Sequence, residues 1–101
     1  EQVTCCPEVM RYIVEIAEAT RDLNDVRMGI SPRGSIALLQ ASRARALMQG
    51  RDYVLPDDVR HLVRPVLSHR LLLRSRGLAQ SRSAEEILDA VLQVIPVPVN
   101  I

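Results

Sequence analysis

Apolar residues recur at helical spacing in four stretches of the chain, with charged residues on the opposite face. Three of the stretches open on a proline, at Pro7, Pro32 and Pro56. Proline suits the first turn of a helix, because an N–H there would have no partner inside the helix anyway. The pattern predicts helices over residues 7–22, 32–49, 56–68 and 84–94.

The expected helix ends carry capping residues. Ser31 is a natural N-cap, because its hydroxyl can accept a hydrogen bond from a free amide of the first turn. Gly50 stands just beyond a helix end, where glycine is common. Ser83 and Glu86 form an S-x-x-E capping box. Leu55 precedes the third helix without a side-chain acceptor, so that helix is expected to begin less firmly.

The segments between the helices are predicted to be loops, apart from one extended segment that pairs with another. Residues 23–30 and residues 74–82 are expected to be loops, since both contain glycine or polar turn residues. Pro65 lies inside the third helical pattern, which predicts a kink or an early end. The pattern around Leu71–Leu72 is extended, and we expect this piece to pair with Tyr53–Val54.

Four helices joined by short links predict an all-α fold, a small four-helix bundle with a minimal two-stranded β contact. The 101 residues fit one domain, so residues 1–101 are expected to form a single domain. Apolar residues make up 48% of the chain, which is enough for one hydrophobic core. A fold class of this kind does not by itself identify a function.

The charge balance argues against a nucleic-acid partner. The net charge is +1, from 13 basic and 12 acidic residues that alternate along the chain. A nucleic-acid binder usually has a basic excess or a one-sided basic stripe. No apolar run approaches the roughly 20 residues of a membrane span, and the start of the sequence lacks a signal-peptide pattern. We therefore expect a cytoplasmic location, without a membrane span or a nucleic-acid partner.

Few residues of the chain could hold a metal ion. The candidate ligands do not fall into a zinc pattern, so no metal site is expected. They are Cys5, Cys6, His61 and His69. Two adjacent cysteines also make no disulfide framework, which favours a reducing compartment.

Other charged residues have structural explanations. Asp57 and Asp58 lie in the first turn of a predicted helix, where acids complement the helix dipole. Arg43 and Arg45 are expected to be solvated or salt-bridged, although a subunit interface could use either. His69 and Arg70 are expected to dock on neighbouring acids or carbonyls; they are not placed in a catalytic site.

Arg33 is the residue that departs most from local expectation. It is the second residue of a predicted helix, where a cation opposes the helix dipole at a cost of roughly 0.3–1 kcal/mol. Departures from local rules concentrate at functional sites. An arginine fork beside the free amides of a helix start would suit phosphate oxygens. The competing explanation is that Arg33 is merely solvated, or pairs with an acid such as Asp25.

Three sequence blocks resemble the C-terminal lid of MoxR-type AAA ATPases. They are G-I-S-P-R-G-S-I-A-L-L-Q-A-S-R-A-R-A-L at 29–47, G-R-D-Y-V-L-P-D-D-V at 50–59 and P-V-L-S-H-R-L at 65–71. The blocks stand in the family's order and spacing, and the resemblance covers roughly residues 9–98. It implies that Arg33, in the motif Ser31-Pro32-Arg33, is the second-sensor arginine that reaches the terminal phosphates of a nucleotide.

The resemblance also implies the other parts and the partners of a complete ATPase. ATP and Mg would be bound mainly by an α/β core domain of the same polypeptide. The lid would close over ATP and couple its hydrolysis to the remodelling of partner proteins, in a chaperone-like role. Neighbouring subunits of an oligomeric ring are implied as partners, as are proteins with a von Willebrand factor A domain.

One departure from the family limits what this chain can do alone. It has no G-x-x-x-x-G-K-[ST] loop and no lysine at all. We therefore expect the isolated chain to have no ATPase activity and no cofactor of its own. The alternative function is a stand-alone helical binding module, either histone-like or for protein interaction. A histone-like protein would be far more basic than this chain and would bind DNA with a strong salt dependence.

Overall fold

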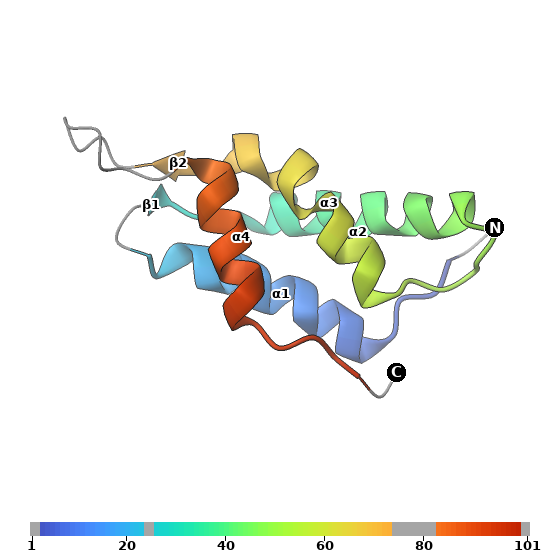
Figure 1. Ribbon diagram of the computed structural model, residues 1–101. Coiled ribbons are helices and arrows are strands. Elements are labelled where there is room, and N and C mark those ends of the chain that lie inside the picture. The colour runs from blue at the N-terminus through green and yellow to red at the C-terminus, as the bar shows by residue number, and fades with distance from the viewer. Residues whose placement is uncertain (1–2, 24–25, 74–82, 100–101) are drawn as a thin grey trace.

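The computed structural model describes residues 3–23, 26–73 and 83–99, and within them four α-helices form the body of the molecule (Figure 1). The predicted all-α bundle is confirmed, and each observed helix begins at its predicted residue and ends within one residue of its predicted end. The helices are α1 (Pro7–Arg21), α2 (Pro32–Met48), α3 (Pro56–Leu67) and α4 (Ala84–Val94).

A two-stranded antiparallel ribbon closes one end of the bundle. Its strands are β1 (Val26–Met28) and β2 (Leu72–Leu73), which lie side by side at the end opposite the N-terminus (Figure 1). A minimal β contact was therefore predicted correctly, but its partners were wrong. Tyr53 instead forms a parallel bridge with Thr4. Strands of two or three residues are too short for their side-chain pattern to specify a partner.

Loops were predicted at residues 23–30 and 74–82. Residues 23–30 are not all loop, because β1 lies within them. The predicted loop at 74–82 lies outside the described residues. Pro65 does not break α3, which continues to Leu67 and then tightens into a 3₁₀ turn over Ser68–Arg70.

The helix starts use the expected residues. The capping box of α4 is formed, since Ser83 Oγ accepts from the Glu86 amide at 3.1 Å and Glu86 Oε1 accepts from the Ser83 amide at 2.9 Å. At α3, Leu55 has no side-chain acceptor, but its own N–H donates to Asp58 Oδ2 at 2.7 Å. That bond anchors the start of α3 more firmly than the sequence suggested.

Asp58 is a fully buried carboxylate that ties α2 to α3. It accepts from Arg45 of α2 at 2.7 Å, and from Arg51 of the α2–α3 link at 2.7 and 2.8 Å. Burial alone would raise the pKa of Asp58, but the hydrogen bonds from Arg51, the Leu55 amide and Arg45 lower it from 3.8 to about 2. The carboxylate is therefore held in its charged form at neutral pH.

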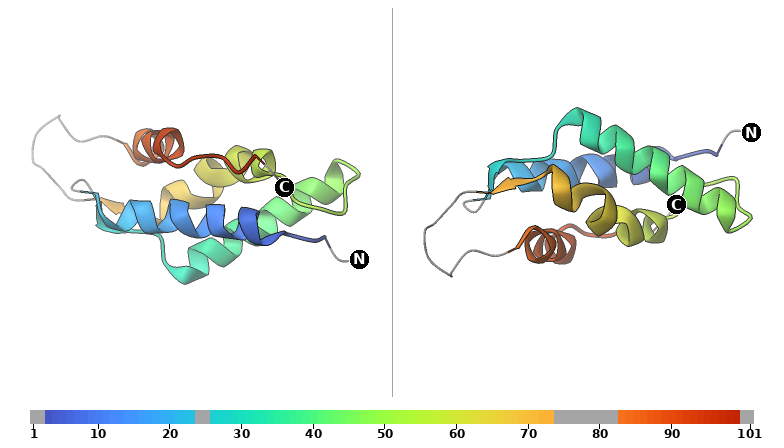
Figure 2. Two further views of the ribbon diagram at one scale, coloured as in Figure 1. Left: turned by 90° about the horizontal axis from the view of Figure 1, so that it is seen from below. Right: turned by 90° about the horizontal axis from the view of Figure 1, so that it is seen from above.

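All four helices contribute to the core, with α2 packed mainly on α3 and also on α1, on the side of the molecule away from α4 (Figure 2). Tyr12 of α1 is buried, and its hydroxyl accepts from Arg60 Nη1 of α3 at 3.1 Å. None of the helices in the described ranges has the length and apolar character needed to cross a membrane.

Candidate functional site

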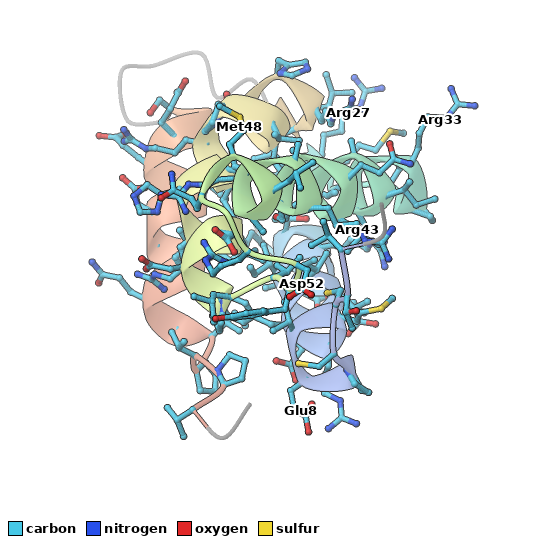
Figure 3. The ribbon with its side chains drawn as sticks, turned by 90° about the vertical axis from the view of Figure 1, so that its right-hand side faces the viewer. Glu8, Arg27, Arg33, Arg43, Met48 and Asp52 are labelled. Atoms are coloured by element: carbon cyan, nitrogen blue, oxygen red, sulfur yellow. The ribbon has the colours of Figure 1, made fainter. Side chains whose placement is uncertain are left out.

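Arg33 lies at the exposed start of α2. Ser31 is the N-cap, as predicted, and its Oγ accepts from the Gly34 amide at 3.3 Å. Arg33 is the second helical residue, and its side chain projects away from α2 (Figure 3). Within the described residues it makes neither a hydrogen bond nor an ion pair, while Asp25, the alternative partner, lies outside them.

The start of α2 has fewer free amides than the sequence suggested. Pro32 has no N–H. The Gly34 amide donates to Ser31 Oγ, and the Ser35 amide donates to the Ser31 carbonyl at 3.1 Å. The backbone N–H of Arg33 is what remains of the first turn. An anion at this corner of the molecule, which residues 31–34 form at the start of α2, would therefore be held chiefly by the Arg33 guanidinium.

The end of α1 fixes the backbone that leads into this corner. Thr20 Oγ1 donates to the Ala17 carbonyl at 2.6 Å and accepts from the Ile30 amide at 2.9 Å. Arg21 donates from Nε and Nη2 to the Ile30 carbonyl at 3.1 and 2.9 Å. Both backbone polar groups of Ile30 are thus held by α1, three residues before Arg33.

Thr20 and Arg21 were missed by the sequence reasoning. The role of Thr20 could have been suspected from its position, because Thr20 lies on the same helical face as Ile16 and Ala17. All three side chains are buried in α1. A polar residue on an apolar stripe needs a hydrogen-bond partner. No local pattern indicates that this partner is the backbone of Ile30.

Arg70 covers the other side of the same corner. Its Nε donates to the Val66 carbonyl at 3.2 Å, which agrees with the expectation that it docks on a carbonyl. A Cβ placed on Gly34 would lie 3.4 Å from its Cδ, so the stem of Arg70 runs along the first turn of α2. The first turn of α2 contains no acidic residue. The corner is therefore basic.

The remaining candidates form no second site in the described part of the chain. No group of three His, Cys, Asp or Glu side chains there could hold a metal ion. His61 Nδ1 lies 2.9 Å from the Asp57 carbonyl of its own helix, and His69 is exposed. Burial, with the neighbouring Cys6, raises the pKa of the Cys5 thiol. A thiol of this kind is a poor nucleophile at neutral pH.

Arg43 and Arg45 differ in their surroundings. Arg45 is salt-bridged to Asp58 at 2.7 Å, whereas Arg43 is exposed. Both outcomes agree with the prediction for this pair. The capping explanation of Asp58 was correct but incomplete, because its carboxylate also binds two arginines.

Comparison with known proteins agrees with this arrangement of helices. The family described as the AAA lid domain matches residues 18–91, and the chain belongs to that family. Among its relatives, the chain is 41% identical over 96 residues to the chaperone MoxR1 of Mycobacterium tuberculosis, a match to 86% of this chain and 26% of that protein. The MoxR protein of Paracoccus denitrificans is 36% identical, over 91% of this chain and 31% of its own length. The chain is thus a lid of the MoxR type, as the sequence blocks indicated.

Two further matches are similar in extent. The Bacillus subtilis protein YeaC is 40% identical over 99% of this chain and 31% of its own length. A crystal structure of a candidate ATPase from Cytophaga hutchinsonii superposes with a TM-score of 0.89 at 28% identity, over 97% of this chain and 32% of that one. The chain spans about a third or less of the length of these relatives.

Proposed function

We propose that residues 1–101 form the lid domain of a longer ATPase, and that Arg33 is its second-sensor arginine. In this role the lid closes over ATP that is bound by a core domain of the same polypeptide, and Arg33 places its guanidinium against the terminal phosphates. The observation that carries the proposal is an exposed arginine, without a partner among the described residues, at the start of a helix in a MoxR-type lid.

The surroundings of Arg33 support this role. Ser31 and Pro32 set the first turn of α2, and the end of α1 holds the preceding backbone through Thr20 and Arg21. The base of the Arg33 side chain is thus fixed while its guanidinium remains in solvent. A fixed base with a free cation is the arrangement that electrostatic stabilisation of developing phosphate charge requires.

The rest of the ATP site belongs outside this chain. The sequence has no phosphate-binding loop and no lysine, and the chain is about a third of the length of its relatives. ATP and Mg would therefore be held mainly by the core domain, where the metal would neutralise phosphate charge. We assign no metal ligand in this chain, and we expect the isolated chain not to hydrolyse ATP.

The proposed partners follow from the same role. They are the core domain, neighbouring subunits of a ring, and client proteins that ATP hydrolysis remodels, with von Willebrand factor A-domain proteins as the candidate class. One of the relatives is named as a chaperone, which fits a remodelling activity in the cytoplasm.

The test is turnover of the longer polypeptide with Arg33→Ala. We expect kcat for ATP hydrolysis to fall by a factor of about 100, because the lost charge acts most strongly on the reacting phosphates. Arg43→Ala is the matched control, since Arg43 is also an exposed arginine of α2. Turnover that is unchanged in Arg33→Ala, or equally reduced in both variants, would contradict the assignment of Arg33.

A further inference from the structure

The last two residues of α1 lie in close contact with the backbone at residues 29–30. A Cβ added to Gly29 would lie 2.8 Å from Thr20 Oγ1 and 2.7 Å from Arg21 Cγ, closer than a real Cβ approaches other atoms. A glycine is therefore required at this position. The chain, which leaves α1 and forms β1, thus returns directly against the residues that end α1.

This contact holds both peptide groups that flank Ile30. The N–H of Ile30 belongs to the preceding peptide group and donates to Thr20 Oγ1 at 2.9 Å, while its carbonyl belongs to the following one and accepts from Arg21 at 2.9 and 3.1 Å. Because φ and ψ are the rotations that relate two such planar groups, the contacts together restrain both angles of Ile30. The Thr20 hydroxyl is itself oriented, since it donates to the Ala17 carbonyl at 2.6 Å.

The two residues after Ile30 continue this restraint as far as Arg33. Ser31 has an extended backbone, with φ −77° and ψ 166°, as is favoured for a residue before proline. Its cap bond to the Gly34 amide holds it in that conformation. The ring of Pro32 locks φ at about −65°. Each residue between the end of α1 and Arg33 on this return path therefore has its own restraint, and the position of the Arg33 backbone is set relative to α1.

A purely structural role would require less than this arrangement provides. Buried backbone groups need a hydrogen-bond partner in any fold. The Ile30 carbonyl, however, receives two donors from the fork of Arg21, an exposed side chain. The restraint also lies just before the residue whose reach matters for the phosphate contact, and a misplacement of about 1 Å at a reacting group can cost a factor of about 100 in rate.

We propose that Thr20 and Arg21 are positioning residues for Arg33 in ATP hydrolysis, an inference that rests on the proposed function. Neither side chain touches the nucleotide. They hold Ile30 in one orientation, so that Arg33 extends towards the phosphates from a fixed backbone. When this hold is lost, Arg33 spends less time in the geometry that stabilises the transition state, which lowers kcat while KM changes little.

The test is a double-mutant cycle on ATP hydrolysis by the longer polypeptide. Thr20→Val keeps the shape of the side chain and removes its hydroxyl, whereas Thr20→Ser retains the hydroxyl. Both are made alone and together with Arg33→Ala, and kcat and KM are measured well below the melting temperature of every variant. Tyr12→Phe is the matched control, because it also removes one hydroxyl hydrogen bond from a buried side chain of α1, about two turns earlier along the helix.

We expect Thr20→Val to lower kcat by a factor of about 10, less than the loss of Arg33 itself, because the guanidinium is still present. KM should change by less than a factor of about 2, as for an interaction that acts in the transition state. Thr20→Ser should restore most of kcat, and Tyr12→Phe should leave it unchanged. In the Arg33→Ala background Thr20→Val should have no further effect, since the group that Thr20 positions is absent.

A fall in kcat by the same factor with and without Arg33 would overturn the proposal, because Thr20 would then act independently of Arg33. An equal effect of Thr20→Val and Tyr12→Phe would overturn it too, since the loss would be one of stability. Unchanged turnover in Arg33→Ala would reject the sensor role, whereas low turnover in Arg33→Ala with normal turnover in Thr20→Val would reject the positioning role alone. If Thr20→Val does not fold, Arg21→Lys takes its place in the cycle, because lysine keeps the charge and lacks the two-donor fork.

Discussion

The Cβ that an alanine at position 34 would add lies 2.7 Å from Cγ2 of Ile30. Ile30 is fully buried, so its side chain has little room to move away. Gly34 is therefore required by close approach, because the first turn of α2 lies directly against the side chain of Ile30, the residue before the N-cap.

Gly34→Ala is expected to destabilise the fold by about 1–3 kcal/mol, the usual range for overpacking a core. This cost outweighs the roughly 1 kcal/mol that alanine gains over glycine inside a helix. Urea denaturation of the chain measures the difference. Ile30→Leu removes the β-branch that the new methyl meets, so the double variant should lose less stability than the sum of the two single variants. A simple sum would show that the two side chains do not meet.

Asp58→Asn is expected to cost about 2 kcal/mol or more in the free energy of unfolding. The substitution leaves Arg45 and Arg51 without the buried carboxylate that both bind, and breaking a buried charge pair is strongly destabilising. Asp57→Asn is the control, because Asp57 is the exposed neighbour in the same helical turn. A loss of similar size in both variants would mean that the helix dipole, rather than the arginine contacts, accounts for the effect.

The same carboxylate makes stability depend on pH. Its pKa is about 2 in the folded chain and 3.8 in the reference state, so the unfolded state binds the proton more readily. The stability that Asp58 contributes is therefore complete above about pH 5 and is lost as the pH falls towards 2, by about 2 kcal/mol in total. Melting curves between pH 6 and pH 2 should show this loss in the parent chain and a smaller one in Asp58→Asn. Parallel curves for the two proteins would contradict the assignment.

The helices were predictable from sequence because their signals are local. Apolar spacing, the prolines at first turns and the capping box of Ser83 with Glu86 all act within a few residues, and each observed helix begins where they indicated. The pairing of β1 with β2 was not predictable, because it joins residues more than 40 positions apart through strands too short to carry a register. Tyr53 has an extended backbone, but its partner is Thr4.

The candidate site was predictable only in part, for a related reason. Arg33 was identified because a cation at a helix start is a local anomaly, and the cap by Ser31 follows from the same few residues. The supports from Thr20 and Arg21 depend on where the end of α1 comes to lie against Ile30. The small number of free amides follows from sequence, because Pro32 has no N–H and the Ser31 cap uses one amide, but which amide the cap uses does not.

The two arginines at this corner, Arg21 and Arg33, should differ in what they do for stability. Arg21 donates two hydrogen bonds to the Ile30 carbonyl, whereas Arg33 makes no hydrogen bond or ion pair within the described residues. Arg21→Ala should therefore cost about 1 kcal/mol, the typical net value of such hydrogen bonds in a partly exposed setting. For a domain of this size that corresponds to a drop of roughly 4–8 °C in Tm.

Arg33→Ala should leave Tm within about 2 °C of the parent, because an exposed charge without a partner contributes little. A small rise in Tm is also consistent, since the substitution removes a cation that opposes the helix dipole. Thermal melts of the two variants under one set of conditions make the comparison. If Arg33→Ala lowered Tm as much as Arg21→Ala does, Arg33 would be a structural residue, and a loss of turnover in the longer polypeptide could no longer be assigned to a missing phosphate contact.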